Sequence, residues 1–344
     1  MTTRIALAST VLLSALLSAL ALVGCKDDKA ESATPDSATG APAAAAPAVA
    51  KPAQKYLPGK CEVVGVVDIR ANLGEASIKQ EIVPQLDKAL NDYLKKDDGK
   101  DLAAVLEKTG VKPLEDLHAA AFCVNDLGAQ GGEPTFTAAI GGKIKPNTVV
   151  PALLESKDKD KFTKGKVGAI DTVEREGVTI GQAPDGTLLV SSSKAAFEEA
   201  AKGESGAVAA AKLPEGQSMA LAAEGPPLAK LMSGAGGQNP FKDTMPKLQH
   251  VMTYSDIQKG TGESRITMAD EASAKALETQ LKALLQQVAQ RPMPGMAMDF
   301  DPKVIAESMS VDGNVVVVKS TGKGDMLSGA VKSLSKELEK ALSK

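Results

Sequence analysis

The sequence predicts an α+β fold: an internally duplicated module of mainly antiparallel strands with amphipathic helices. Short β-branched runs alternate with segments of helical periodicity along the chain after residue 56. Asp185-Gly186 and Asp312-Gly313 each separate two strand-like runs, a pattern that strongly favours a tight β-hairpin turn. The elements of residues 56–205 also recur in a similar order in residues 206–344.

The first predicted repeat, residues 56–205, begins with a β-branched strand at Val63–Ile69. A long helix follows, because apolar residues recur four apart between Ile78 and Leu94. Asp101 is predicted to cap a second helix. The other expected elements are strands Leu117–Val124 and Thr135–Ile140, a helix Val149–Ser156, hairpin strands Val173–Gln182 and Thr187–Ser192, and a helix Lys194–Lys202.

The second predicted repeat, residues 206–344, follows the same plan with fewer helices. Its expected elements are strand Met219–Ala223, helix Pro227–Met232, strands His250–Tyr254 and Arg265–Ala269, helix Ala272–Gln290, hairpin strands Ile305–Val311 and Asn314–Ser320, and an amphipathic helix Met326–Leu342. The two sheets are expected either to join into one continuous sheet or to stand as two similar lobes with a groove between them.

Composition excludes some functional classes. The formal net charge of −3 and the pI near 5.7 give no basic surface, so we expect no nucleic-acid partner. Aromatic residues make up only 3% of the chain, which argues against sites that stack sugars or quaternary amines on aromatic rings.

The N-terminus reads as a secretory signal. Arg4 supplies the positive charge, an apolar stretch runs from Ile5 to Val23, and small residues precede a cysteine. The ending Leu22-Val23-Gly24-Cys25 resembles the lipobox of bacterial lipoproteins. Two other interpretations remain open, an uncleaved membrane-spanning helix and a plain secretory signal.

The lipobox resemblance implies that residues 1–24 are removed and that Cys25 becomes a lipidated N-terminus. Acyl chains on its thiol and amino group, palmitate among them, would hold the protein stably on a membrane. Lys26, rather than Asp, follows the cysteine. This pattern resembles lipoproteins sent to the outer membrane, so the outer membrane is favoured over the inner one.

Residues 25–55 are predicted to form a disordered tether rich in alanine and proline. This composition cannot bury enough apolar surface to offset the entropy of ordering. A tether of this kind implies that the folded part works away from the lipid surface.

Cys61 and Cys123 remain after the predicted lipidation site. An even pair in an oxidising compartment favours a disulfide, and the alternative is two buried free thiols.

No catalytic constellation is recognisable. The chain has only two histidines, His118 and His250, at equivalent positions of the two repeats and outside any metal-binding motif. Ser191 and Lys194 superficially suggest a Ser-x-x-Lys motif, but a serine at a strand–helix junction more simply caps the helix. We therefore expect no enzyme activity and no cofactor.

A methionine-rich loop, residues 291–300, suggests an alternative function. Met293, Met296 and Met298 are soft thioether ligands of the kind that selects Cu(I). Structural packing and a flexible contact loop are the other interpretations.

The leading hypothesis is a lipid-anchored protein of the cell envelope with its folded domain outside the cytoplasm. It would act as a non-catalytic binding module whose partner is an envelope protein or another envelope component. Extracytoplasmic Cu(I) handling through the methionine loop is the alternative.

Overall fold

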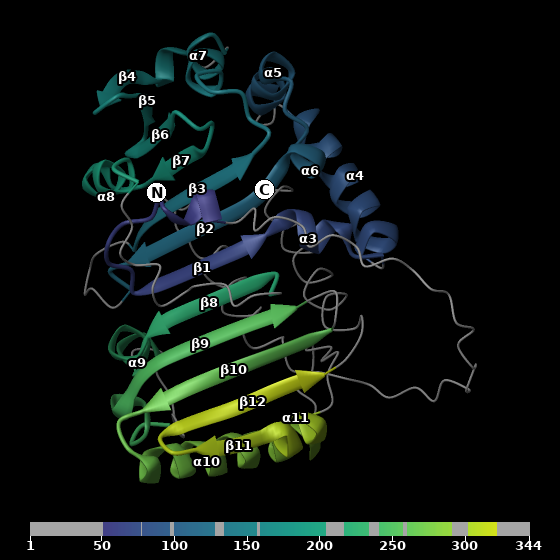
Figure 1. Ribbon diagram of the computed structural model, residues 1–344, viewed down its shortest axis with the longest axis vertical. Coiled ribbons are helices and arrows are strands. Elements are labelled where there is room, and N and C mark those ends of the chain that lie inside the picture. Colours follow the sequence, from purple (N-terminus) through teal and green to yellow (C-terminus); the bar gives the residue numbers. More distant parts are fainter. Residues whose placement is uncertain are drawn as a thin grey trace.

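One antiparallel sheet organises the fold (Figure 1). This computed structural model describes residues 51–76, 78–96, 100–127, 134–156, 159–203, 217–233, 241–256, 260–290 and 302–321. The twelve strands described there form a continuous sheet in the order β11-β12-β10-β9-β8-β1-β2-β3-β7-β6-β5-β4. The expectation of an α+β fold is confirmed, and of its two arrangements the single continuous sheet is correct.

The strands are β1 Val63–Asp68, β2 Leu117–Asn125, β3 Thr135–Gly142, β4 Thr163–Val167, β5 Ile170–Arg175, β6 Val178–Gln182, β7 Leu188–Ser191, β8 Met219–Glu224, β9 Leu248–Asp256, β10 Thr261–Met268, β11 Met309–Asp312 and β12 Val315–Thr321. The helices are α2 Lys51–Gln54, α3 Ile69–Gly74, α4 Val83–Leu94, α5 Lys100–Thr109, α6 Pro113–Asp116, α7 Val149–Leu154, α8 Lys194–Ala200, α9 Gly225–Ser233, α10 Glu271–Gln290 and α11 Pro302–Ser308. Short η segments lie at Ile78–Ile82, Lys159–Lys161 and Met245–Lys247.

The strand order is symmetric about the central β1–β8 pair. Moving outward from it, β2 corresponds to β9, β3 to β10, β7 to β12 and β6 to β11, and the first half adds β5 and β4. Both Asp-Gly hairpins form as expected, with Gly186 and Gly313 at positive φ. The residue boundaries of the two repeats, 56–205 and 206–344, stay predictions.

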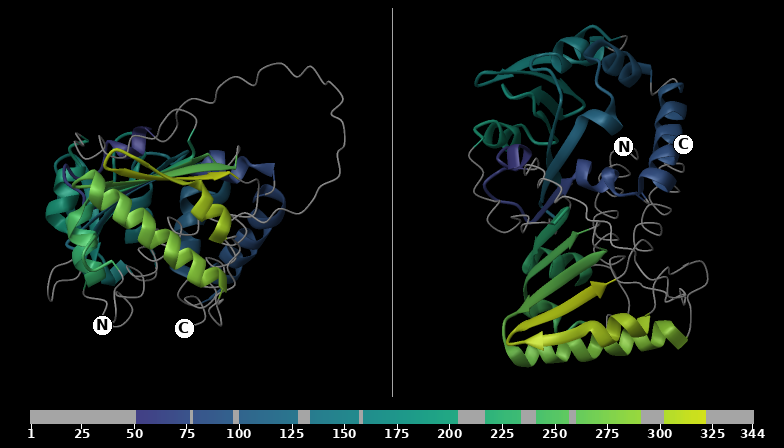
Figure 2. Two further views of the ribbon diagram at one scale, coloured as in Figure 1. Left: turned by 90° about the horizontal axis from the view of Figure 1, so that it is seen from below. Right: turned by 45° about the vertical axis from the view of Figure 1, so that its right-hand side comes forward.

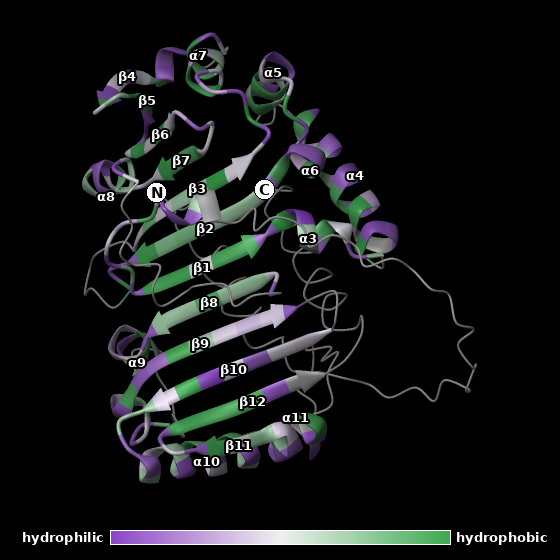
Figure 3. Cartoon of the chain, viewed as in Figure 1, coloured by the Kyte–Doolittle hydropathy of each residue, from purple (hydrophilic) through white to green (hydrophobic). Residues whose placement is uncertain are grey.

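β1 joins the two halves by pairing with β2 on one side and β8 on the other, and both of its faces are buried. Its register with β8 runs from Val63 opposite Ala223 to Val67 opposite Met219. Val64 and Val66 belong to one buried cluster and Val63 to a second. Figure 3 shows β1 as an almost wholly apolar strand. Such two-sided burial explains why the strand reads as a continuous β-branched run rather than an alternating one.

Gly65 is required where β1 meets β2. A Cβ added at this position would lie 2.2 Å from ring atoms of Phe122. The missing side chain lets the Phe122 ring lie against β1, where it packs on the second cluster.

The two clusters lie on opposite faces of the sheet. The first cluster includes Ala53 of α2, Leu57 just after α2, and Phe197 of α8. The second takes Leu228 from α9 and Leu277 from α10. Figure 2 shows α2 and α10 on opposite sides of the sheet.

Three expectations need correction. Val173–Gln182 is two strands, because Glu176 and Gly177 adopt positive φ and turn the chain. The hairpin strand expected at Ile305–Val311 begins only at Met309, since Pro302–Ser308 form α11 and bury Ile305 in helical register. Lys51–Gln54, assigned to the tether, form α2, where Ala53 is fully buried in the first cluster.

Other differences are omissions. β4 was not predicted, because its residues are polar and mostly exposed and so lack an apolar period. The predicted helix Met326–Leu342 lies outside the described residues.

Cys61 and Cys123 form a disulfide, with their Cα atoms 5.3 Å apart. Cys61 lies just before β1, and Cys123 is opposite Val64 in the β1–β2 register. The expected bridge is thereby confirmed. Disulfides persist in oxidising compartments, so this one indicates an extracytoplasmic folded domain.

Replacing both cysteines, Cys61→Ala with Cys123→Ala, should lower the free energy of unfolding by about 2–4 kcal/mol. The reason is that the bridge closes a long loop in the unfolded chain. Urea denaturation monitored by circular dichroism measures the change. Reduced wild-type protein is the control and should unfold at the same midpoint as the variant. An unchanged midpoint would show that the bridge contributes nothing to stability.

Candidate functional site

The strongest candidate surface is one face of β9, β10, β12 and β11, here called the helix-free face. Along β9 and β10, Val251 and Ile266 point to the cluster that holds α10's Leu277. The alternate residues therefore point to the opposite side of the sheet. Figure 1 looks onto this side, and none of the described helices crosses these strands there.

Register places the side chains of this face in three rows across the strands. Tyr254 lies opposite Glu263, and Glu263 lies opposite Lys319. The second row is Met252, Arg265 and Val317, and the third is His250, Thr267 and Val315. At β8 the face is bounded by Ala220 and Ala222, which are each 2% exposed.

Tyr254, Glu263 and Arg265 form a hydrogen-bonded cluster at the centre of the face. Arg265 Nη1 donates to Glu263 Oε1 over 2.8 Å, and the Tyr254 hydroxyl also bonds to Glu263. Burial by itself would raise the pKa of Glu263, but the bonds from Tyr254 and Arg265 bring that pKa below its ordinary value. Glu263 is therefore a carboxylate at neutral pH and holds the guanidinium in place.

Tyr254 of this cluster and the nearby His250 also have shifted pKa values. Burial, followed by the hydrogen bond to Glu263, raises the pKa of the Tyr254 hydroxyl, so this group stays protonated. Burial lowers the pKa of His250, and the charge of Glu224 opposes the shift only in part. At neutral pH the face thus presents a neutral imidazole, a phenol, a thioether and a cation side by side.

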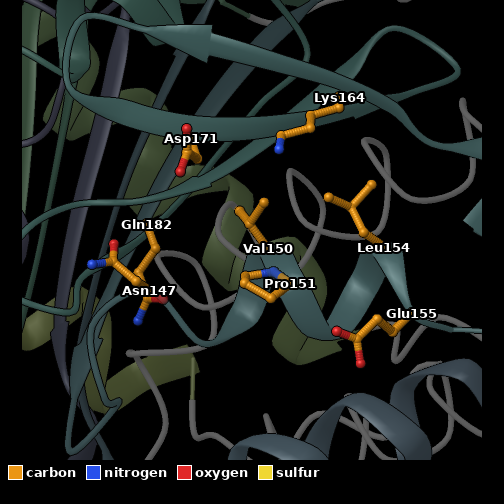
Figure 4. A pocket seen from close by; sticks show the side chains of 8 residues that line it. All are labelled: Asn147, Val150, Pro151, Leu154, Glu155, Lys164, Asp171 and Gln182. Carbon is orange, nitrogen blue, oxygen red and sulfur yellow. The ribbon is translucent and has the colours of Figure 1, made fainter.

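A second candidate is a cavity of about 220 Å³ between α7 and strands β4 to β6. Figure 4 shows Lys164 and Asp171 across from Val150, Pro151 and Leu154 of α7. This volume is below the range of about 300–1,000 Å³ that is usual for small-molecule sites.

Gln182, on the wall of this cavity, has a structural role. Its Nε2 donates to the carbonyl oxygens of Lys145 and Gly186, at 2.8 and 3.1 Å. Its Oε1 accepts from the backbone N–H of Thr148 and Val149. Because these bonds use both ends of the amide, Gln182 fixes the turn before α7 and leaves little for a ligand.

The two histidines do not form a joint site. His118 lies beside Ala119, which pairs with Asp68 at the end of β1 next to the start of β8. His250 pairs with Glu224 at the other end of β8. The matching register shifts of β2–β3 and β9–β10 make Ala119, and not His118, the counterpart of His250, so the expected equivalence of the two histidines is wrong. Counterpart positions of the two halves lie at opposite ends of the sheet.

The serines after β7 have structural roles. Ser193 Oγ accepts from the backbone N–H of Ala196 and caps α8, as the sequence predicts. Ser191 is fully buried and bonds to Thr137 and to the Phe136 carbonyl. Among the described contacts, neither hydroxyl is hydrogen-bonded to the amine of Lys194, so no serine there is paired with a lysine base.

The remaining predicted site residues lie outside the described part of the chain. They are Cys25 and the methionines Met293, Met296 and Met298. Within the residues that the structure does describe, no three His, Cys, Asp or Glu side chains gather as a metal site would require. None of the helices described is long and apolar enough to span a bilayer.

The cluster of Tyr254, Glu263 and Arg265 on the helix-free face was not predicted from the sequence. Tyr254 and Glu263 come from different strands, and only the β9–β10 register brings them together. One signal was available: Glu263, Arg265 and Thr267 alternate with Ser264 and Ile266, a period-two pattern typical of a strand with one polar face.

The fold and this surface define an α+β protein with one continuous antiparallel sheet. No protein-family model and no curated protein matches the chain. Crystal structures of TP0453 are similar to it. Crystal form III has a TM-score of 0.46 at 10% identity, covering 82% of this chain and 97% of that chain. Form I has a TM-score of 0.44 at 12% identity, with the same coverage of both chains. Form IV has a TM-score of 0.44 at 10% identity, covering 83% and 95%.

Stability should fall as the pH drops from 7 to 5, because two histidines have lowered pKa values. Burial is the main cause for both, and the charges of Arg70 and Lys143 add to the effect at His118. Below the ordinary histidine pKa of 6.5, the unfolded chain binds more protons than the folded one, so acid favours unfolding.

His250→Gln should therefore flatten part of this decline, and adding His118→Gln should flatten more of it. Urea unfolding at pH 7, 6 and 5 measures the slope. The lowered pKa of Glu263 affects stability only at more acidic pH, so Glu263→Gln is a control that leaves this window unchanged. An unaltered slope in the double histidine variant would contradict the assignment.

Proposed function

We propose that this chain is a lipid-anchored, non-catalytic binding protein of the cell envelope that recruits a protein partner through its helix-free face. Anchoring rests on the lipobox resemblance ending at Cys25, and it agrees with a disulfide-bonded folded domain. Outer-membrane placement rests on Lys26 after that cysteine.

One observation carries the binding role: Tyr254, Met252 and Arg265 adjoin on a face without a described helix. Tyrosine, methionine and arginine are the residue types enriched at protein interfaces, and tyrosine and arginine often dominate the binding energy. The Glu263 carboxylate already orients the arginine, so less side-chain entropy is lost on binding. The rim supplies charges of both signs, Asp312 and Lys319, which are exposed.

A broad sheet surface suits a protein partner better than a small molecule. The rows described above span several strands, and strands lie about 4.8 Å apart. The α7 cavity is small, and its buried amide is already satisfied. A predicted tether from Lys26 to residue 50 would let this face reach partners roughly 80 Å from the bilayer if fully extended.

The partner surface can be tested with a photo-reactive amino acid at position 250 in living cells. Position 250 borders Tyr254 and Arg265 without removing them. We expect one reproducible crosslinked protein. Adding Tyr254→Ala should weaken its binding by about 2 kcal/mol and so sharply reduce the adduct.

The matched control carries the same amino acid at Lys166, an exposed residue of the edge strand β4. It should give no such adduct. Identical adducts from both positions, or an adduct insensitive to Tyr254→Ala, would refute this face as the binding surface.

Anchoring has its own test, intact-mass analysis of the native protein. We expect a mature chain that starts at Cys25 and carries acyl chains. Cys25→Ala should carry no acyl chains, because the thiol that the lipobox resemblance marks for acylation is missing. A mature chain trimmed without fatty acid would refute the anchor and leave the binding surface untouched.

A further inference from the structure

Arg265 is the accessible member of the charged pair at the centre of the helix-free face. Its side chain is 41% exposed, whereas that of Glu263 is 17% exposed. In its row, the half-buried Met252 of β9 and the buried Val317 of β12 lie on either side of it. Apolar neighbours lower the local dielectric constant, which strengthens any hydrogen bond that the guanidinium makes there.

Glu263 occupies only part of the guanidinium. Arg265 Nη1 donates to Glu263 Oε1, and among the described residues the other polar partner of Arg265 is Tyr254. A guanidinium carries a planar fork of five N–H donors, so about three donors are left for a further acceptor. The exposed side of Arg265 can therefore bind a second group while Glu263 stays in place.

The Glu263 carboxylate is itself shared between two cations. Lys319 lies opposite Glu263 on β12, is exposed and interacts electrostatically with it. The Tyr254 hydroxyl, which also bonds to Glu263, is neutral. Two cations beside one carboxylate leave one positive charge in excess at this point of the face.

The other carboxylates of the face are too distant to cancel this excess. Glu224 and Asp312 lie at the two ends of the third row, on β8 and β11. Each is two strands from β10, or about 10 Å, which exceeds the Debye length of about 8 Å at physiological salt. Asp256 is two rows from Arg265 and is only 4% exposed.

We propose that the partner of the helix-free face presents a carboxylate to Arg265, from an aspartate or glutamate flanked by apolar residues. This inference rests on the proposed function, because it names the chemistry of the partner that the function requires. The guanidinium fork matches a carboxylate, since two parallel N–H···O bonds form between them. The apolar flank would contact Met252 and the Tyr254 ring, which border Arg265.

The same arrangement makes the recognition selective. A partner without an acid would cover the excess positive charge and leave it unpaired, and an unpaired buried charge is strongly unfavourable. Selectivity between partners often depends on such a penalty as much as on attractive contacts. The face therefore favours an acidic partner segment and disfavours a neutral or basic one.

The test is a selection of displayed random peptides on the purified full-length protein in detergent. Parallel selections use Arg265→Gln and, as the matched control, Arg175→Gln on the distant strand β5. We expect the wild type to enrich peptides with an aspartate or glutamate beside apolar residues. Arg175→Gln should enrich the same peptides, whereas Arg265→Gln should not. Urea midpoints of all variants check that each one is folded.

A double-mutant cycle then measures the contact itself. In one selected peptide the acid is replaced by its amide, and the affinities for the wild type and for Arg265→Gln are measured by fluorescence anisotropy. Either single change should weaken binding by about tenfold or more, and the second should add little to the first. Arg265→Lys should bind with intermediate affinity, because it keeps the charge but lacks the fork.

Three outcomes would overturn the inference. The first is that no selected peptide depends on Arg265, or that the dependent peptides lack an acid. The second is that the two changes in the cycle are additive. The third is that the protein binds vesicles of phosphatidylglycerol through Arg265 in place of acidic peptides, which would assign the arginine to lipid.

The proposed function and this inference can fail separately. Peptides that lose binding in Tyr254→Ala but not in Arg265→Gln would retain the helix-free face as the binding surface and reject the carboxylate. Acidic peptides that depend on Arg265, together with identical cellular adducts from positions 250 and 166, would support the carboxylate chemistry and refute the proposed binding surface in cells.

Discussion

The pairing of β1 with β8 is the constraint on which the rest of the structure depends. Five residue pairs, from Val63–Ala223 to Val67–Met219, join the two halves into one sheet. β1 contributes side chains to a buried cluster on each face, so neither cluster is complete without it. The two halves therefore cannot separate as lobes without exposing apolar surface on both faces, at about 25 cal/mol per Å².

The same pairing determines where functional groups lie. Because β1 and β8 are antiparallel, equivalent residues of the two halves point to the same face but lie at opposite ends of the sheet. His250 and its register counterpart Ala119 therefore lie at opposite ends of the sheet, and β12 is the counterpart of β7. One half covers its Leu189 with α8, while the other presents Tyr254, Glu263 and Arg265 on a face without a described helix.

Much of the fold was accessible from local sequence. The Asp-Gly hairpins, the long helix α10 and the disulfide partners were all predicted, because turn chemistry, helical periodicity and cysteine count act over short stretches or by simple pairing. Errors fell where local signals are ambiguous. Glu176-Gly177 interrupts a β-rich run with a turn. The first residues of the strand expected at Ile305–Val311 belong instead to the helix α11, and β4 has no apolar period.

By itself, the sequence determined the α+β class, the duplicated order of elements and the expectation of an exported, lipid-anchored chain, because these follow from periodicity, turn residues and a contiguous N-terminal motif. Only the tertiary structure decided that the halves form one sheet and that Tyr254, Glu263 and Arg265 form a cluster. Both depend on strand register between segments far apart in the chain, and register is set by side-chain packing on the two faces, which no local pattern encodes.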